Sequence, residues 1–236
     1  MFESNERLKP SMPDTPLPTE ERPDTRERLL DAAEQLFAER GVTATSLRAV
    51  TKAADANLAA VHYHFGSKEE LLSAVVARRV RPINEERLRL LDRLQAGSGD
   101  RAADLDEILS ALLLPMIRET GRNPERVPTF TRLMGRVLTD MGTGTHALVV
   151  HHFAEVLQRF AAALSRALPH LTPEEIAWRL HFCIGTMAFT LVHSPHLAEM
   201  SRGLCRSHDA DRVMEQMIPF LAAGFQAPSS IDEEAS

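Results

Sequence analysis

The chain has 236 residues, of which 44% are hydrophobic and 25% charged, and its formal net charge is −6. This is an ordinary composition for a folded protein, and the length allows one large core or a small domain beside a larger one. A negative net charge argues against a protein that coats nucleic acid regardless of sequence, but it is compatible with a local positive surface.

The sequence shows neither a secretion signal nor a membrane-spanning segment. Its proline-rich N-terminal region lacks a basic stretch followed by an apolar run, and no apolar stretch reaches the roughly 18 residues that a spanning helix needs. We therefore expect a cytoplasmic protein without a membrane partner. The two cysteines, Cys183 and Cys205, have neither CxxC nor metal-ligand spacing, so we expect free thiols.

Both ends of the chain are predicted to be disordered. Residues 1–22 hold prolines among Ser, Thr and Glu, a composition that buries too little apolar surface to offset the entropy of the chain. The same reasoning applies to the short acidic tail over residues 226–236. The basic residues of the N-terminal arm leave open a weak contact with phosphates, but a solvated tail is the favoured interpretation.

The segment after the arm has the pattern of several short packed helices. Apolar residues recur at three- and four-residue steps over residues 29–37, which predicts a helix with one buried face, and Gly41 is placed to end it. Thr45 or Ser46 can cap a second helix, and Asn57 opens a third, LAAVHYHF. Helices this short are stable only when packed, and a helix-turn-helix accounts for them.

The rest of the chain also predicts helices. The fourth helix is expected from Ser67 or Lys68 to about Leu94, with a bend at Pro82. Further apolar-faced helices, separated by Gly- and Pro-containing turns, are predicted over residues 105–119, 128–140, 146–168, 173–193 and 209–224. Because no alternating strand pattern occurs, the predicted fold class is all-α.

Residues 25–72 resemble the DNA-binding domain of the TetR family of transcriptional regulators, at the Gly turn, the aromatic pair of HYHF and the start SKEEL of the fourth helix. Within the family, the stretches NLAAVHYHFGSKEELLSAV, WRLHFCIGTMAFTL and MIPFLAAG resemble the PsrA-like branch of long-chain fatty-acid-responsive sigma-regulators. The resemblance implies a three-helix DNA-binding domain over 23–70 and a helical ligand-binding and dimerisation domain over 71–225.

The third helix is the expected recognition element, because the N-terminal part of this helix enters the major groove in a helix-turn-helix. Asn57 and His62 can hydrogen-bond to base edges or phosphates, and the small Ala59 and Ala60 can approach thymine methyl groups. The helix contains no arginine for the common contact to guanine. Base reading is therefore expected to depend on Arg48 and on DNA shape as well.

The resemblance assigns two further residues, Tyr63 and Lys68, to phosphate contacts, and Thr45 fits a contact of the same kind. A core position is the alternative for Tyr63, whereas Phe65 is assigned to the core outright. The candidate DNA-binding residues are Thr45, Ser46, Arg48, Asn57, Leu58, Ala59, Ala60, His62, Tyr63, His64 and Lys68.

The helix predicted over residues 173–193 is apolar apart from one narrow polar stripe, and the last predicted helix is also too apolar for a monomer's surface. Pairing both helices with their copies in a second subunit gives a four-helix dimer interface, which the family implies and a palindromic operator requires. The candidate interface residues are Ala177, Ile184, Gly185, Ala188, Val213, Met217, Phe220 and Leu221.

An effector site is expected among the helices of the larger domain. Arg132, Arg136 and His181 are candidates for receiving a carboxylate or holding a thioester carbonyl, although a hydrogen-bonded core histidine remains the alternative for His181. The nature of the effector, an acyl chain, is implied by the resemblance and not by these positions. The candidate lining residues are Leu109, Leu113, Met116, Phe130, Leu133, Met134, Arg136, Val137, Phe153, Leu157, Trp178, His181 and Phe182.

The sequence is thus interpreted as a homodimeric, ligand-responsive repressor that binds a palindromic operator in double-stranded DNA, with a long-chain fatty acid or acyl-CoA altering its affinity. Two alternatives remain: an aromatic or cationic hydrophobic effector, and a helical protein-interaction module that does not bind DNA. The sequence contains no nucleophile elbow, phosphate loop or metal motif, so we expect neither an enzyme nor a cofactor nor a metal site.

Overall fold

The computed structural model describes residues 24–99, 101–122, 127–139, 147, 150–205 and 209–229. The arm predicted over residues 1–22 and most of the tail predicted over 226–236 lie outside these ranges. Every regular element within the described ranges is an α-helix, which confirms the predicted all-α fold. None of the helices described is long and apolar enough to cross a membrane.

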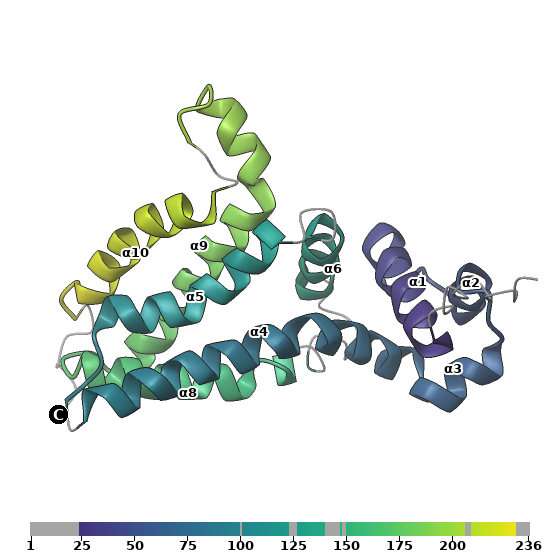
Figure 1. Ribbon diagram of the computed structural model, residues 1–236, viewed down its shortest axis with the longest axis horizontal. Helices are drawn as coiled ribbons and strands as arrows, with labels where there is room; N and C mark the ends of the chain where they lie inside the picture. Colours follow the sequence, from purple (N-terminus) through teal and green to yellow (C-terminus); the bar gives the residue numbers. More distant parts are fainter. Residues whose placement is uncertain are drawn as a thin grey trace, which may run out of the picture.

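The helices form an elongated molecule with a small end and a larger body (Figure 1). Helix α4 runs from the small end, made by α1–α3, along the body, made by α5 and α8–α10, while α6 lies beside α1. The helix bounds are α1 Thr25–Arg40, α2 Leu47–Ala53, α3 Leu58–Phe65, α4 Lys68–Ser98, α5 Leu105–Arg122, α6 Val127–Thr139, α8 Ala154–Ala167, α9 Pro173–Met200 and α10 Ala210–Gln226.

Short polar side chains begin the helices of the small end. Ser46, Asn57 and Ser67 each accept a hydrogen bond from the backbone N–H three residues later, at 3.2, 2.9 and 3.1 Å. These bonds satisfy N–H groups that have no partner inside the helix. Gly41 ends α1 with a φ of 86°, a conformation that glycine adopts without steric cost. The sequence predicted these boundaries, with Ser46 rather than Thr45 as the cap.

The buried apolar side chains form two clusters. The first, called here the N-terminal core, joins α1–α3 and the first half of α4 to Phe130 and Leu133 of α6. The second, called the body core, joins Leu91 of α4 to α5, α8, α9 and α10. Met116 of α5 packs against both clusters. Helix α4 therefore contributes to both cores and connects them.

Helices α8 and α9 differ most from their predicted bounds. Helix α9 was predicted to end at His193 but continues to Met200, and its final turns project from the body (Figure 1). Because the projecting turns contact little of the core, they need no apolar face, and their sequence has no helical hydrophobic period from which the helix could be predicted. Helix α8 begins only at Ala154, because a turn at His152 and Phe153 precedes it.

Candidate functional site

Helices α2 and α3 form a helix-turn-helix in which one face of α3 is buried and the other is exposed. Val61 and Phe65 point into the N-terminal core, where they are 0% and 7% exposed. Tyr63 is 86% exposed, which excludes the core alternative for this ring. The turn between the helices contains Asp55 with a φ of 49°, a left-handed conformation that aspartate tolerates better than most residues. The prediction that Phe65 belongs to the core is confirmed.

Most of the candidate DNA-binding side chains lie on the outside of this unit. The exposed ones are Ser46, Arg48, Asn57, Leu58, Ala59, His62 and Tyr63, and the partly exposed ones are Ala60, His64 and Lys68. Residues at the start of α2 and along α3 are therefore accessible from outside the protein.

Thr45 is an exception, because its side chain is turned inward. The residue is 1% exposed, and its hydroxyl, which has one proton to donate, lies 2.8 Å from the Gly41 carbonyl oxygen and 3.2 Å from that of Leu36. The hydroxyl closes the end of α1 and is not presented to a phosphate. The expectation of a side-chain phosphate contact for Thr45 is therefore wrong.

Two other candidates make bonds within the protein that orient them. The Lys68 ammonium donates to the carbonyls of Val42 at 2.9 Å and Thr45 at 3.2 Å, and so fixes the turn between α1 and α2. An ammonium has three N–H donors, so one remains for an outside anion. The Nδ1 of His62 lies 2.8 Å from the Gly66 carbonyl oxygen and acts there as the donor, which leaves Nε2 on the outer side of that bond.

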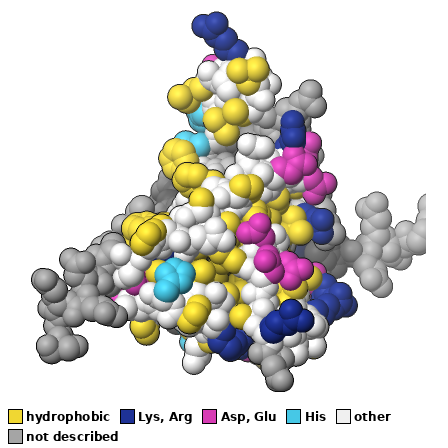
Figure 2. All heavy atoms as spheres, turned by 90° about the vertical axis from the view of Figure 1, so that its left-hand side faces the viewer, with side chains coloured by type: hydrophobic (Ala, Val, Ile, Leu, Met, Phe, Trp, Pro, Cys, Tyr) yellow, Lys and Arg dark blue, Asp and Glu magenta, His cyan; other side chains and the backbone are white. Residues whose placement is uncertain are grey.

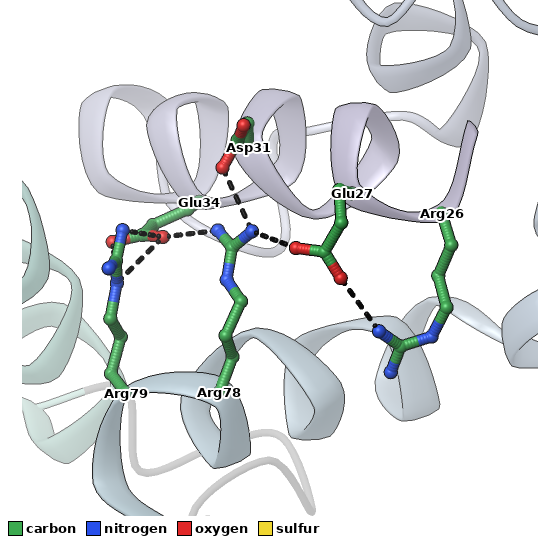
Figure 3. A network of polar contacts seen from close by, with 6 residues as sticks. All are labelled: Arg26, Glu27, Asp31, Glu34, Arg78 and Arg79. Atoms are coloured by element: carbon green, nitrogen blue, oxygen red, sulfur yellow. Dashed lines mark hydrogen bonds and ion pairs between the residues drawn. The ribbon is translucent and has the colours of Figure 1, made fainter. Parts of the chain in front are cut away.

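A network of arginines and carboxylates joins α1 to the first half of α4 (Figure 3). Arg78 contacts Glu27, Asp31 and Glu34 at 3.0, 2.9 and 2.7 Å, and Arg79 contacts Glu34 at 2.9 Å. Glu34 is only 4% exposed. Partial burial opposes the Arg78 charge, but its hydrogen bonds with Glu34 and Glu27 outweigh that effect and raise its pKa. Every charge in this network has an opposite charge beside it.

The outer face of α9 carries an exposed aromatic surface. Trp178, Phe182 and Phe189 are 54%, 59% and 65% exposed, and Phe220 of α10 is 68% exposed. The small residues Ala177, Gly185 and Ala188 of α9 are exposed as well. Figure 2 views the end of the body opposite α1–α3, where hydrophobic side chains extend over the surface and many charged ones gather to one side.

This surface corrects two groups of predictions. Trp178, His181 and Phe182 were expected to line the effector site, but all three are exposed on the outer face of α9. Met217 and Leu221 were expected at a subunit surface, but they belong to the body core of their own subunit, and Val213 and Ile184 are partly buried. A helical hydrophobic period predicts which residues share a face of the helix, but it does not predict whether that face packs in the core or lies on the surface.

The remaining effector candidates divide between the two cores. Leu109 and Leu113 belong to the body core, with Met116 packed against it, whereas Phe130, Leu133, Met134 and Phe153 belong to or pack against the N-terminal core. Leu157 is partly buried, and the side chains of Arg136 and Val137 lie outside the described part of the structure. Arg132 is exposed beside Asp31 and Glu34. The expected residues therefore do not form one site.

The second half of α4 contains a buried polar cluster that was not predicted from the sequence. Arg87 is 5% exposed, and its Nε donates to the Leu112 carbonyl of α5 at 2.7 Å. One of its terminal nitrogens, Nη1, donates to the Asn84 side-chain oxygen at 3.0 Å, and Asn84 donates to the His152 carbonyl at 2.8 Å. The signal was available: Arg87 lies four residues after Ile83 and four before Leu91 on the apolar stripe of α4.

Burial shifts two ionisable groups in this region. It lowers the pKa of Arg87 to about 10 and raises the pKa of the neighbouring Cys183 thiol to about 12. Cys183 is a buried free thiol and Cys205 an exposed one, as predicted. Among the described residues, no group of three or more His, Cys, Asp or Glu side chains is arranged to hold a metal ion.

Comparison with known proteins places this architecture in a family. Residues 29–75 match the model of bacterial regulatory proteins of the tetR family, and residues 110–224 match that of a tetracyclin repressor-like C-terminal domain. The transcriptional repressor Rv3405c of Mycobacterium tuberculosis is 31% identical over 136 residues, which cover 56% of this chain and 70% of Rv3405c. This chain belongs to the TetR family. Members of the TetR family are transcriptional regulators.

Other proteins are similar to this chain over shorter regions or in fold alone. The nicotine-responsive repressor HdnoR of Paenarthrobacter nicotinovorans is 32% identical over 96 residues, which cover 41% of this chain and 47% of HdnoR. The chain thus spans about half the length of this relative. The structure of FadR from Bacillus subtilis in complex with stearoyl-CoA has a TM-score of 0.56 at 13% identity, covering 84% of this chain and 98% of FadR.

Proposed function

We propose that this TetR-family chain is a homodimeric repressor that places two copies of α3 in successive major grooves of a palindromic operator. The observation that carries the proposal is the exposure of α3: Asn57 at its start, His62 and the 86% exposed Tyr63 are exposed while Val61 and Phe65 are buried, and Arg48 of α2 is exposed as well. A helix held by two buried residues and exposing polar side chains along its length suits major-groove recognition.

Each exposed side chain has a distinct proposed contact. The Asn57 oxygen accepts the capping hydrogen bond of α3, so its amide N–H groups are the part offered to DNA. His62 offers Nε2, since Nδ1 is bonded to the Gly66 carbonyl. Tyr63 and the remaining N–H of Lys68 are proposed to contact phosphates, which position the protein without reading sequence.

The proposed dimer forms through the exposed face of α9 together with Phe220 of α10. Large aromatic side chains that are more than half exposed, such as Trp178, Phe182 and Phe189, are unusual on the surface of a monomer and typical of interfaces. The exposed Gly185 and Ala188 allow a second helix to approach closely. A twofold dimer matches the symmetry of a palindromic operator.

The proposed effector is a long-chain fatty acid or acyl-CoA. The resemblance to the PsrA-like branch supports this class, as does the shared fold with a FadR that was crystallised with stearoyl-CoA. Binding among α4, α5, α8 and α9 would move α4, which contributes to both cores, and so change the spacing of the two α3 helices. A coupling of about 1 to 3 kcal/mol between effector and operator is typical.

A second candidate effector, an aromatic or cationic hydrophobe, is favoured by the relative HdnoR, whose name records a response to nicotine. Thermal-shift measurements with long-chain acids, their coenzyme A esters and aromatic amines would separate the two classes. A helical interaction module is the candidate from another class. Selection of bound sequences from random duplex DNA tests this candidate. Enrichment of a palindrome would rule out the interaction module, whereas retention of no duplex would support it.

The Tyr63→Phe substitution tests the proposed DNA contact once an operator is known. Removing a hydrogen bond to a phosphate should weaken binding about tenfold, by a similar factor for strong and weak operators. Arg93→Gln is the matched control, because it removes an exposed charge from the second half of α4 and should leave affinity nearly unchanged. Equal affinities for Tyr63→Phe and the parent protein would remove Tyr63 from the interface.

A further inference from the structure

The second half of α4 contains a buried positive charge that no carboxylate balances among the described residues. Arg87 is 5% exposed, and the described groups that it contacts are the Leu112 carbonyl, the Asn84 side-chain oxygen and the Met187 sulfur. All three are neutral. Burying an unpaired guanidinium is unfavourable, so a fold that retains one has a structural or a functional reason for it.

The hydrogen bonds of Arg87 leave part of its guanidinium weakly satisfied. Nε and Nη1 have good acceptors at 2.7 and 3.0 Å, whereas the contact of Nη2 is the thioether of Met187 at 3.9 Å. A thioether is a weak acceptor on a flexible side chain. Displacing it by a carboxylate oxygen would replace the weakest contact of the guanidinium with a charge-assisted hydrogen bond.

The surroundings of Arg87 suit an apolar chain attached to that carboxylate. Leu112 and Met187, which Arg87 contacts, belong to the body core and are 2% and 8% exposed. Cys183 on α9 is 0% exposed, and burial keeps its thiol protonated because its pKa is raised to about 12. The neighbouring thiol therefore supplies no counter-charge at neutral pH.

We propose that Arg87 binds the carboxylate of a free long-chain fatty acid, which enters between α4, α5 and α9 and displaces the Met187 side chain. This proposal rests on the proposed function and makes its effector specific. In a coenzyme A ester the acyl carbon forms a neutral thioester, and the phosphates lie far along a polar chain that the body core does not accommodate. The unpaired charge at Arg87 therefore favours the free acid over its ester.

The same contact offers a route from the effector to the DNA-binding end. Arg87 is bonded to Asn84, Asn84 to the backbone of His152, and the His152 ring to Ser73 in the first half of α4 at 2.9 Å. A carboxylate that draws the guanidinium away from Asn84 weakens the first bond of this series. Its release frees Asn84 and the turn at His152 to shift relative to the part of α4 that supports α1.

The proposal is tested by direct binding measurements on the full chain, using oleate, oleyl alcohol and oleoyl-CoA below their micelle concentrations. The parent protein should bind oleate at least tenfold more tightly than the alcohol, because the alcohol lacks the charge that pairs with Arg87. Arg87→Met should bring the two ligands to within about twofold while retaining binding of the alcohol. Arg87→Lys keeps the charge and should preserve most of the preference.

Several results would overturn the proposal while leaving the repressor intact. They are tighter binding of oleoyl-CoA than of oleate by the parent protein, an unchanged preference for oleate in Arg87→Met, and no binding of oleate to a protein that still binds its operator. If Arg87→Met does not fold, the acid-to-alcohol ratio of the parent protein and of Arg87→Lys still decides. Failure to bind any operator, measured without effector, would count against the proposed function alone.

Discussion

Helix α4 carries two arginine sites in opposite electrostatic settings. In its first half, Arg78 and Arg79 meet the buried carboxylate of Glu34 and two more exposed acids on α1 (Figure 3). In its second half, Arg87 is more deeply buried and meets a carbonyl, an amide and a thioether. Arginines of the same helix are thus paired with carboxylates in its first half, whereas in its second half the described partners of Arg87 are all neutral.

The difference separates a contact that maintains the fold from one suited to a ligand. A buried pair such as Glu34 with its arginines is expensive to break, because the surviving partner is left charged without a counter-ion. A single buried charge costs stability in the empty protein, and only an incoming anion recovers that cost.

The largest expected effect is that of Glu34→Gln. Removing this carboxylate leaves Arg78 and Arg79 without their buried partner, so the free energy of unfolding should fall by about 2 to 3 kcal/mol, as measured by denaturant titration. Asp31→Asn is the matched control. Asp31 contacts Arg78 but its side chain is 65% exposed, so the loss should stay below about 1 kcal/mol. Equal losses in the two variants would contradict the assigned role of Glu34.

The next effect is that of giving Arg87 a counter-ion through Asn84→Asp. A carboxylate at this position would neutralise the guanidinium, and the preference for oleate over oleyl alcohol should fall by about tenfold in direct binding measurements. Asn84→Ala also removes the hydrogen bonds of Asn84 but adds no charge, so it should retain the preference. If both variants keep it, the unpaired charge is not the source of acid binding.

A smaller effect is expected for Arg87→Met in the absence of any effector. Here the lost bond to the Leu112 carbonyl is offset by removal of a buried charge, so stability should stay within about 1 kcal/mol of the parent protein. Denaturant titrations of Arg87→Met and Glu34→Gln compare the two losses in the free energy of unfolding. A loss as large as that of Glu34→Gln would make Arg87 a structural residue of the same kind.

The smallest effect concerns His152, whose ring contacts Ser73 and whose backbone carbonyl accepts a hydrogen bond from Asn84. Its pKa is lowered by partial burial and by the nearby positive charges of His151 and Arg81. The His152 side chain therefore takes up a proton more readily in the unfolded chain. The contribution of its neutral form to stability is fully present above about pH 6.5 and is lost as the pH falls through the folded-state pKa. His152→Gln should lose less stability between about pH 7.5 and pH 5.5 than the parent protein does. The same pH dependence in His152→Gln as in the parent protein would contradict this assignment.

The sequence predicted best the features that depend on neighbouring residues. The caps at Ser46 and Asn57 and the end of α1 at Gly41 follow from backbone hydrogen bonding within one turn, and the structure has all three. Burial on a helical face was harder, since the period that groups Trp178 with Phe182 is the same whether the face meets a core or solvent. The contacts of Arg87 join helices distant in sequence, which no local pattern specifies.

Helix α6 has a consequence for attempts to separate the two halves of the molecule. Phe130 and Leu133 of α6 are 8% and 0% exposed and complete the core around α1, although they follow it by about a hundred positions in the sequence. A fragment that ends with the first turns of α4 would leave those apolar surfaces bare and prone to self-association. Transfer of the helix-turn-helix unit, α1–α3 with the start of α4, to another regulator would therefore require α6 or an equivalent helix as well.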